Sequence, residues 1–179
     1  MEAMTATATA SLIQQKSDQR SGKYLTFCLG NEEFAIQVLR VREIMGVLDI
    51  NAVPQTPGYV KGVINLRGKV IPVVDLRLKF GLAELEYTPR TCIIVVQIDV
   101  VQIDRGSSGG GHLQIGIIVD AVSEVLTLQA NDIENTPDFG IGVAIPYLLG
   151  MAKIKGKVKI LLDINRVLSA QEAAGLGSL

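Results

Sequence analysis

The chain repeats itself, and the repeat limits the folds that it can adopt. Residues 62–76, GVINLRGKVIPVVDL, align without a gap on residues 150–164, GMAKIKGKVKILLDI, and most of the exchanges are conservative. A second, weaker repeat precedes each copy: residues 35–44 resemble residues 116–125. Self-similarity of this kind is typical of a duplicated structural unit. We therefore expect two related halves.

Length and charge exclude several classes of function. A chain of 179 residues, of which 48% are hydrophobic, can form one domain or two small subdomains that share a core. The formal net charge of −1 argues against a general attraction to nucleic acid or anionic lipid. No apolar run approaches the ~20 residues of a membrane-spanning helix, and the N-terminus lacks the pattern of a secretory signal. We expect a cytoplasmic protein without direct membrane insertion.

Short runs of strand-forming residues, separated by turn residues at regular spacing, predict a mainly β protein, either a barrel or a sandwich. Each copy of the repeat should be a hairpin, with Arg67-Gly68 forming the tight turn of the first copy. Residues 38–45 fit either a short helical turn or a bent strand. Residues 166–173 are typical of a closing helix.

Residues that could carry chemistry are few and scattered. His112 is the only histidine and cannot by itself build a zinc site, and Cys28 and Cys92 form no metal-binding or redox pair motif. The duplicated Asp75 and Asp163 lack the flanking residues of an aspartic-protease dyad. We expect each aspartate to end a strand and to cap the following turn. The sequence predicts no catalytic, cofactor or metal site.

Four motifs resemble those of the CheW family of chemotaxis coupling proteins: VREI, PGYVKGVINLRG, VIPVVDLRLKFG and GIIVDAVSEVL. The resemblance covers residues 23–168. It implies two SH3-like, five-stranded β-barrels around a shared hydrophobic interior, with no catalytic activity. It also implies two partners, which are the regulatory domain of the histidine kinase CheA and the cytoplasmic tip of methyl-accepting chemoreceptors.

The polar, non-periodic ends of the chain and the resemblance together predict a domain organisation. Residues 1–22 are expected to be a disordered tail and residues 169–179 a mobile tail. The CheW-like domain between them should contain a first barrel at about 35–85 and a second barrel at about 90–160, which exchange terminal segments.

The motifs also match positions that the family uses to bind partners, which are Val41, Glu43, Arg67, Val122 and Val125. Glu43 and Arg67 match a charged pair, although two unrelated solvated charges would give the same pattern. The valines match positions at or near a groove between the barrels that can receive a receptor helix, and each of them could instead be plain core. Gly62 and Gly68 are expected to serve the backbone, by a close approach at one position and a turn at the other.

One segment departs from the family pattern. The pentapeptide VVQID occurs at 95–99 and again at 100–104, before a glycine-rich loop. Five extra residues reverse the faces of a strand of period two, so the second copy cannot simply extend the same buried face. Either the hairpin projects from the second barrel or the extra residues join the loop.

Other functions remain possible from the sequence. The chain could be a CheW-like scaffold of another chemosensory pathway, a detached regulatory domain of a kinase, or an SH3-like nucleic-acid module. The last would need a basic stripe with exposed aromatic residues. The 17 basic residues are balanced by 18 acidic ones, and only 4% of residues are aromatic, which argues against it.

Overall fold

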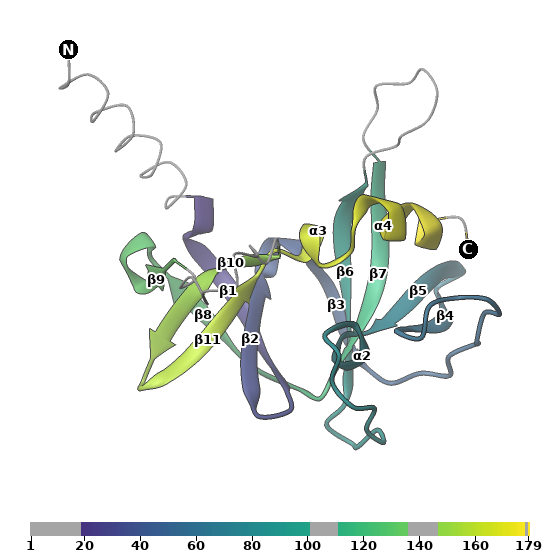
Figure 1. The fold of residues 1–179 in the computed structure, drawn as a ribbon, viewed down its shortest axis with the longest axis horizontal. Coiled ribbons are helices and arrows are strands. Elements are labelled where there is room, and N and C mark those ends of the chain that lie inside the picture. Colours follow the sequence, from purple (N-terminus) through teal and green to yellow (C-terminus); the bar gives the residue numbers. More distant parts are fainter. Residues whose placement is uncertain (1–18, 101–110, 136–146, 178) are drawn as a thin grey trace, which may run out of the picture.

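The computed structural model describes residues 19–100, 111–135, 147–177 and 179. They form two β-sheets with a few short helices (Figure 1). This confirms the prediction of a mainly β protein with two β subdomains. In the described part of the chain, every helix is too short or too polar to span a bilayer.

The six-stranded sheet combines the two ends of the chain. Its strands are, in spatial order, β8 (Ala121–Leu128), β1 (Gly22–Leu29), β2 (Glu32–Gln37), β11 (Lys157–Leu162), β10 (Leu148–Ile154) and β9 (Ile133–Glu134). Only β2 and β11 run parallel, and the other neighbours are antiparallel.

The five-stranded sheet contains the middle of the chain. Its strands are, in spatial order, β3 (Val41–Gly46), β6 (Cys92–Val100), β7 (Gly111–Val119), β5 (Lys69–Asp75) and β4 (Val60–Leu66). Here β5 and β7 are the parallel pair. Each sheet therefore has one parallel pair that joins a hairpin of the repeat to a strand from elsewhere in the chain.

The two sheets do not follow the consecutive ranges 35–85 and 90–160 that the sequence led us to expect. The chain crosses between the sheets twice, after β2 through the 3-10 turn η1 (Val38–Arg40) and at Asp120 between β7 and β8. Each sheet thus takes strands from both halves. Sequence similarity shows which segments are alike but not which strands pair, and for this reason the boundaries differ.

The two copies of the repeat have the same local structure. Both are hairpins with a two-residue turn, Arg67-Gly68 in β4–β5 and Lys155-Gly156 in β10–β11. The φ angles are 53° and 82° in the first turn and 51° and 78° in the second. Positive φ at both central residues is the type I′ geometry that matches the twist of a hairpin.

The largest hydrophobic cluster lies between the sheets. It contains Phe27 and Ile36 of the six-stranded sheet and Ile94 and Ile117 of the five-stranded sheet, all of them fully buried. This cluster is the shared interior that holds the two subdomains together.

The C-terminal region folds onto this cluster. Residues 169–179 were expected to be a mobile tail, but α4 (Ala170–Gly177) is a helix whose Ala173 and Leu176 are buried in the cluster. The expected closing helix is split into α3 (Ile164–Val167) and α4; both contact β6, and α4 crosses in front of β6 and β7 in Figure 1.

Two expectations fall partly outside the described residues. The expected N-terminal tail at 1–22 lies outside them up to residue 18, and β1 already begins at Gly22. The first copy of VVQID lies in β6, whereas the second copy beyond Val100 is outside the described part of the chain.

Candidate partner-binding surface

Two edge strands, β3 of the five-stranded sheet and β8 of the six-stranded sheet, carry four of the five residues that the sequence assigned to partner binding. Among the described residues, β3 pairs only with β6 and β8 pairs only with β1. The free edge of such a strand exposes unpaired backbone N–H and C=O groups. The two strands also carry the weaker repeat, so that Val41 of β3 corresponds to Val122 of β8.

Two of the three valines pack against the same hydrophobic cluster. Val41 and Val122 are half-buried, and both pack against the large cluster between the sheets. Val125 is 54% exposed, and its counterpart in β3, Ile44, is 45% exposed. Each edge strand therefore offers one apolar side chain to the interior and one to the surface.

Glu43 and Arg67 form an ion pair, with 3.0 Å between Arg67 Nη2 and Glu43 Oε1. Glu43 lies on β3 and Arg67 lies in the turn that ends β4, and these strands are the two edges of the five-stranded sheet. The pair therefore links β3 at one edge of the sheet to the turn that follows β4 at the other edge. Arg67 is 78% exposed, so the pair contributes roughly 0 to 1 kcal/mol to stability.

The two glycines occupy different environments. A Cβ atom at Gly62 would lie 2.0 Å from the carbonyl oxygen of Asn51, and the φ angle of Gly62 is 139°. Asn51 is joined to Val63 by two backbone hydrogen bonds of 2.9 Å, which hold the β3–β4 connection against β4. Gly68, by contrast, faces open space, and its backbone N–H donates to Asn65 Oδ1 at 3.0 Å.

The duplicated aspartates cap helices, as the sequence predicted. Asp75 Oδ1 accepts a hydrogen bond from the backbone N–H of Arg77 at 2.9 Å, at the start of α2 (Leu76–Lys79). Asp163 Oδ1 accepts one from Asn165 at 3.1 Å, at the start of α3. Burial raises the pKa of Asp75. Both carboxylates are thus engaged in local structure.

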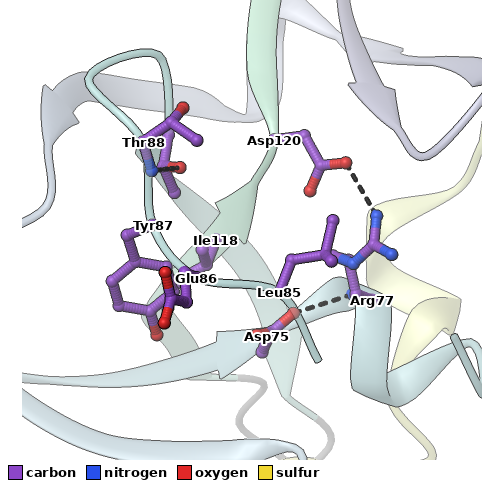
Figure 2. Close-up of a pocket in the computed structure, with 9 residues that line it drawn as sticks. Asp75, Arg77, Leu85, Glu86, Tyr87, Thr88, Ile118 and Asp120 are labelled. Atoms are coloured by element: carbon purple, nitrogen blue, oxygen red, sulfur yellow. Dashed lines mark hydrogen bonds and ion pairs between the residues drawn. The ribbon is translucent and has the colours of Figure 1, made fainter. Parts of the chain in front are cut away.

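A small pocket of about 130 Å³ lies beside Asp75 (Figure 2). On one side of it, Arg77 Nη1 contacts Asp120 Oδ2 at 2.7 Å, and the same oxygen accepts a hydrogen bond from the N–H of Gly30 at 2.7 Å. Arg77 follows β5 of the five-stranded sheet, whereas Gly30 is in the β1–β2 turn of the six-stranded sheet. Arg77, Asp120 and Gly30 thus connect the two subdomains, and we call this set of contacts the joint at Asp120.

This joint was not predicted from the sequence. Arg77 and Asp120 both lie inside the family motifs, but their counterparts in the other half are Asn165 and Leu39, so the repeat gave no sign that they pair. Their contact spans 43 residues of sequence.

The described residues hold little that could support catalysis or a metal. His112 Nδ1 contacts Asp99 Oδ1 at 2.9 Å, but both side chains are at least half exposed. Arg40 binds the other oxygen of Asp99 at 3.1 Å. Among the described residues there is no group of three or more potential metal ligands. The cluster is a surface ion network.

Comparisons with known proteins agree with one another. The family model for the CheW-like domain matches residues 23–172. The chain is 38% identical to the chemotaxis protein CheW of Klebsiella aerogenes, over 85% of this chain and 84% of that protein. It is 34% identical to the chemotaxis protein CheW of Rhizobium meliloti, over 83% of this chain and 88% of that protein.

A solved structure shows the same fold. The structure of the scaffolding protein TtCheW from Thermoanaerobacter tengcongensis superposes with a TM-score of 0.69 at 30% sequence identity. The match covers 85% of this chain and 97% of that one.

Proposed function

This chain belongs to the CheW family, and we propose that it is a non-catalytic adaptor that couples methyl-accepting chemoreceptors to the histidine kinase CheA. Its role as a scaffold in chemotaxis signalling follows from the family. The two specific partners and the cytoplasmic location that they require are our proposal.

The two edge strands β3 and β8 give the strongest support for this function. Each strand combines a free backbone edge with exposed apolar side chains, Ile44 on β3 and Val125 on β8. The cytoplasmic tip of a receptor is helical, and exposed apolar side chains on an edge strand suit the apolar face of a helix. We place the receptor at Val41, Val122 and Val125.

The ion pair of Glu43 with Arg67 supports the same surface indirectly. It holds the β4–β5 turn against β3 and so fixes the position of the edge strand that carries Val41. A partner that contacts β3 would therefore bind more weakly when the pair is broken, even though the fold would be almost as stable.

A calorimetric titration tests the coupling role. The full chain is titrated with the regulatory domain of the cognate CheA kinase, and then with a receptor fragment that contains the cytoplasmic tip. We expect saturable one-to-one binding in both titrations. Absence of binding to both partners, with a sample whose circular dichroism shows a folded β protein, would refute the proposal.

A matched pair of variants tests the receptor surface. Val125→Lys places a charge on β8 and should abolish binding of the receptor fragment while leaving binding of the kinase domain in place. Val70→Lys is the control, because Val70 is 60% exposed on β5 and lies outside the proposed receptor surface. Equal receptor affinity for the two variants would show that β8 is not the receptor site.

A further inference from the structure

A larger pocket, of about 540 Å³, lies between the β1–β2 turn, α2 and the β10–β11 hairpin. Its lining is mostly apolar, with the charged residues Glu32 and Arg77 at its side, and includes Phe34, Phe80, Tyr147, Met151 and Ile160. None of the five residues assigned above to partner binding contributes to it. Its volume is within the range of protein sites that bind small molecules or single side chains.

Three aromatic rings give the pocket a fixed shape. The ring centroids of Phe34 and Phe80 are 5.7 Å apart, and those of Phe80 and Tyr147 are 5.2 Å apart. Their side chains are half-buried and pack against the cluster between the subdomains. Rings held by packing on one side can accept an apolar group on the other at little cost in conformational entropy.

The pocket continues onto the face of the β10–β11 hairpin. Met151 is paired with Ile160, and the next residues on the same face, Lys153 and Val158, are also paired with each other. Val158 is 47% exposed and Lys153 is exposed. At ~3.3 Å per residue, the distance along β10 from Met151 to the turn residue Lys155 is about 13 Å.

The positive charge at this turn is not neutralised within the described structure. Lys153 and Lys155 form no ion pair with any described residue. In the other copy of the repeat, the residue that corresponds to Lys155 is Arg67, which is paired with Glu43. The two hairpins have the same backbone but differ in whether their turn cation has a partner.

We propose that this pocket and the adjoining turn, the hairpin site, bind a short acidic segment of a partner protein. A large apolar side chain of the segment enters the pocket, and carboxylates two to four residues away contact Lys153 and Lys155. An extended peptide has the length that this arrangement needs, since the pocket and the two cations lie along one strand. Two lysines beside a pocket are too few to hold the chain on an anionic membrane, which requires a larger basic cluster.

The hairpin site goes beyond the proposed coupling function, because it adds a partner surface that is separate from β3 and β8. Its occupant is recognised by charge and by one apolar anchor. It could therefore be engaged while the edge strands are occupied.

Peptide titrations followed by NMR test the proposal with the full, isotope-labelled chain. The probe is the blocked peptide EEFEE, and the comparison peptides are EEAEE, which lacks the anchor, and KKFKK, which has the opposite charge. We expect saturable shifts of the backbone amides of Phe34, Met151 and Ile160 with EEFEE only. No saturable shift at millimolar peptide, or equal shifts with EEAEE, would overturn the proposal.

Two lysines on opposite faces of the hairpin provide a matched pair of variants. Lys153→Glu should weaken binding of EEFEE by about three- to tenfold at low salt, and the difference should shrink at high salt. Lys157→Glu should leave the affinity unchanged, because Lys157 is adjacent to Val158 and points to the other face of β11. Equal effects of the two variants would contradict the site.

One further variant distinguishes a partner from the chain itself. Residues 136–146 contain Asp138 and Phe139, which have the same chemistry as the probe. Phe139→Ser should not change the affinity for EEFEE. If the peptide binds only after this substitution, the natural occupant of the pocket belongs to the chain, and the proposal of a partner is wrong.

Discussion

Two glycines of the same hairpin show how differently single residues can matter. Gly62 has a carbonyl oxygen at the place where a side chain would begin, whereas Gly68 has open space there. Glycine is therefore needed at position 62 because a side chain would clash with the backbone of Asn51. At position 68 glycine is needed only because the φ angle there is 82°.

We expect Gly62→Ala to lower the free energy of unfolding by about 2 to 4 kcal/mol, because the added Cβ would collide with the backbone of Asn51. Urea denaturation followed by circular dichroism measures the change. Gly46→Ala is the control, since Gly46 lies on β3 with open space and without a positive φ angle, and it should change the stability by less than about 0.5 kcal/mol. A loss at Gly62 no larger than at Gly46 would contradict this account.

Arg67→Ala should lower the stability by less than about 1 kcal/mol and should weaken partner binding. The reason is that the pair with Glu43 is exposed but positions β3. Lys155→Ala is a control for stability, because Lys155 has the same positive φ in the equivalent turn and no ion pair with a described residue. Unchanged affinity of Arg67→Ala for both the receptor fragment and the kinase domain would show that the pair has no role in binding.

At the scale of elements, hairpins and caps could be predicted from the sequence because they depend on adjacent residues. Arg67-Gly68 makes a turn and Asp75 caps the residues that follow it. The helix α4 could not be recognised in full. Its first turn is held by Tyr59 and Lys79, which lie about ninety to one hundred and ten residues earlier in the chain and contact Glu172.

Glu172 connects α4 to the rest of the protein. Its side chain accepts hydrogen bonds from Tyr59 and Lys79, and it also accepts one from the backbone N–H of Ser169, the residue before the helix. Burial by itself would raise the pKa of Glu172, but these hydrogen bonds outweigh burial and lower the pKa to about 2. The same contact contributes, after burial, to raising the pKa of Tyr59 to about 12.

This contact makes stability depend on pH. Because the folded-state pKa of Glu172 is below its unfolded value, the stabilisation is complete above about pH 5 and is lost as the pH falls toward 2. We expect Glu172→Gln to cost about 1 kcal/mol at pH 7, after allowance for partial exposure, and progressively less as the pH falls toward 2. Urea denaturation of both proteins across this range measures the difference, and Glu86→Gln, at an exposed glutamate, is the control. A difference that does not depend on pH would contradict the role of the charge.

At the scale of the whole molecule, the repeat predicted two related halves and the family resemblance predicted that they exchange terminal segments, but neither predicted which strands pair after the exchange. The similarity of residues 35–44 to residues 116–125 in fact marks the two crossovers between the sheets, where β2 passes to β3 and β7 passes to β8. A local pattern cannot show this, because each strand is compatible with either sheet. Pairing is decided by the parallel contacts of β2 with β11 and of β5 with β7, which join residues far apart in sequence.

The two crossovers are secured by contacts of different strength. At one of them, Arg77, which is 11% exposed, binds Asp120, which is 28% exposed. At the other, Arg40 and Asp99 are 31% and 50% exposed. Breaking a pair costs more when the remaining charge is left in a buried place. The joint at Asp120 should therefore control the relative orientation of the subdomains.

We expect Asp120→Asn to lower the free energy of unfolding by about 2 to 3 kcal/mol, less than for a fully buried pair, because Asp120 retains some contact with water. Asp99→Asn should cost much less, because Asp99 is exposed and its charge is solvated. Hydrogen exchange should locate the change: the amide of Gly30, which donates to Asp120, should exchange faster in Asp120→Asn, while amides in the centre of β6 and β7 remain protected. Residual dipolar couplings should also show a changed angle between the two sheets. Identical couplings and equal losses of stability in the two variants would show that the subdomains are held by their shared core alone.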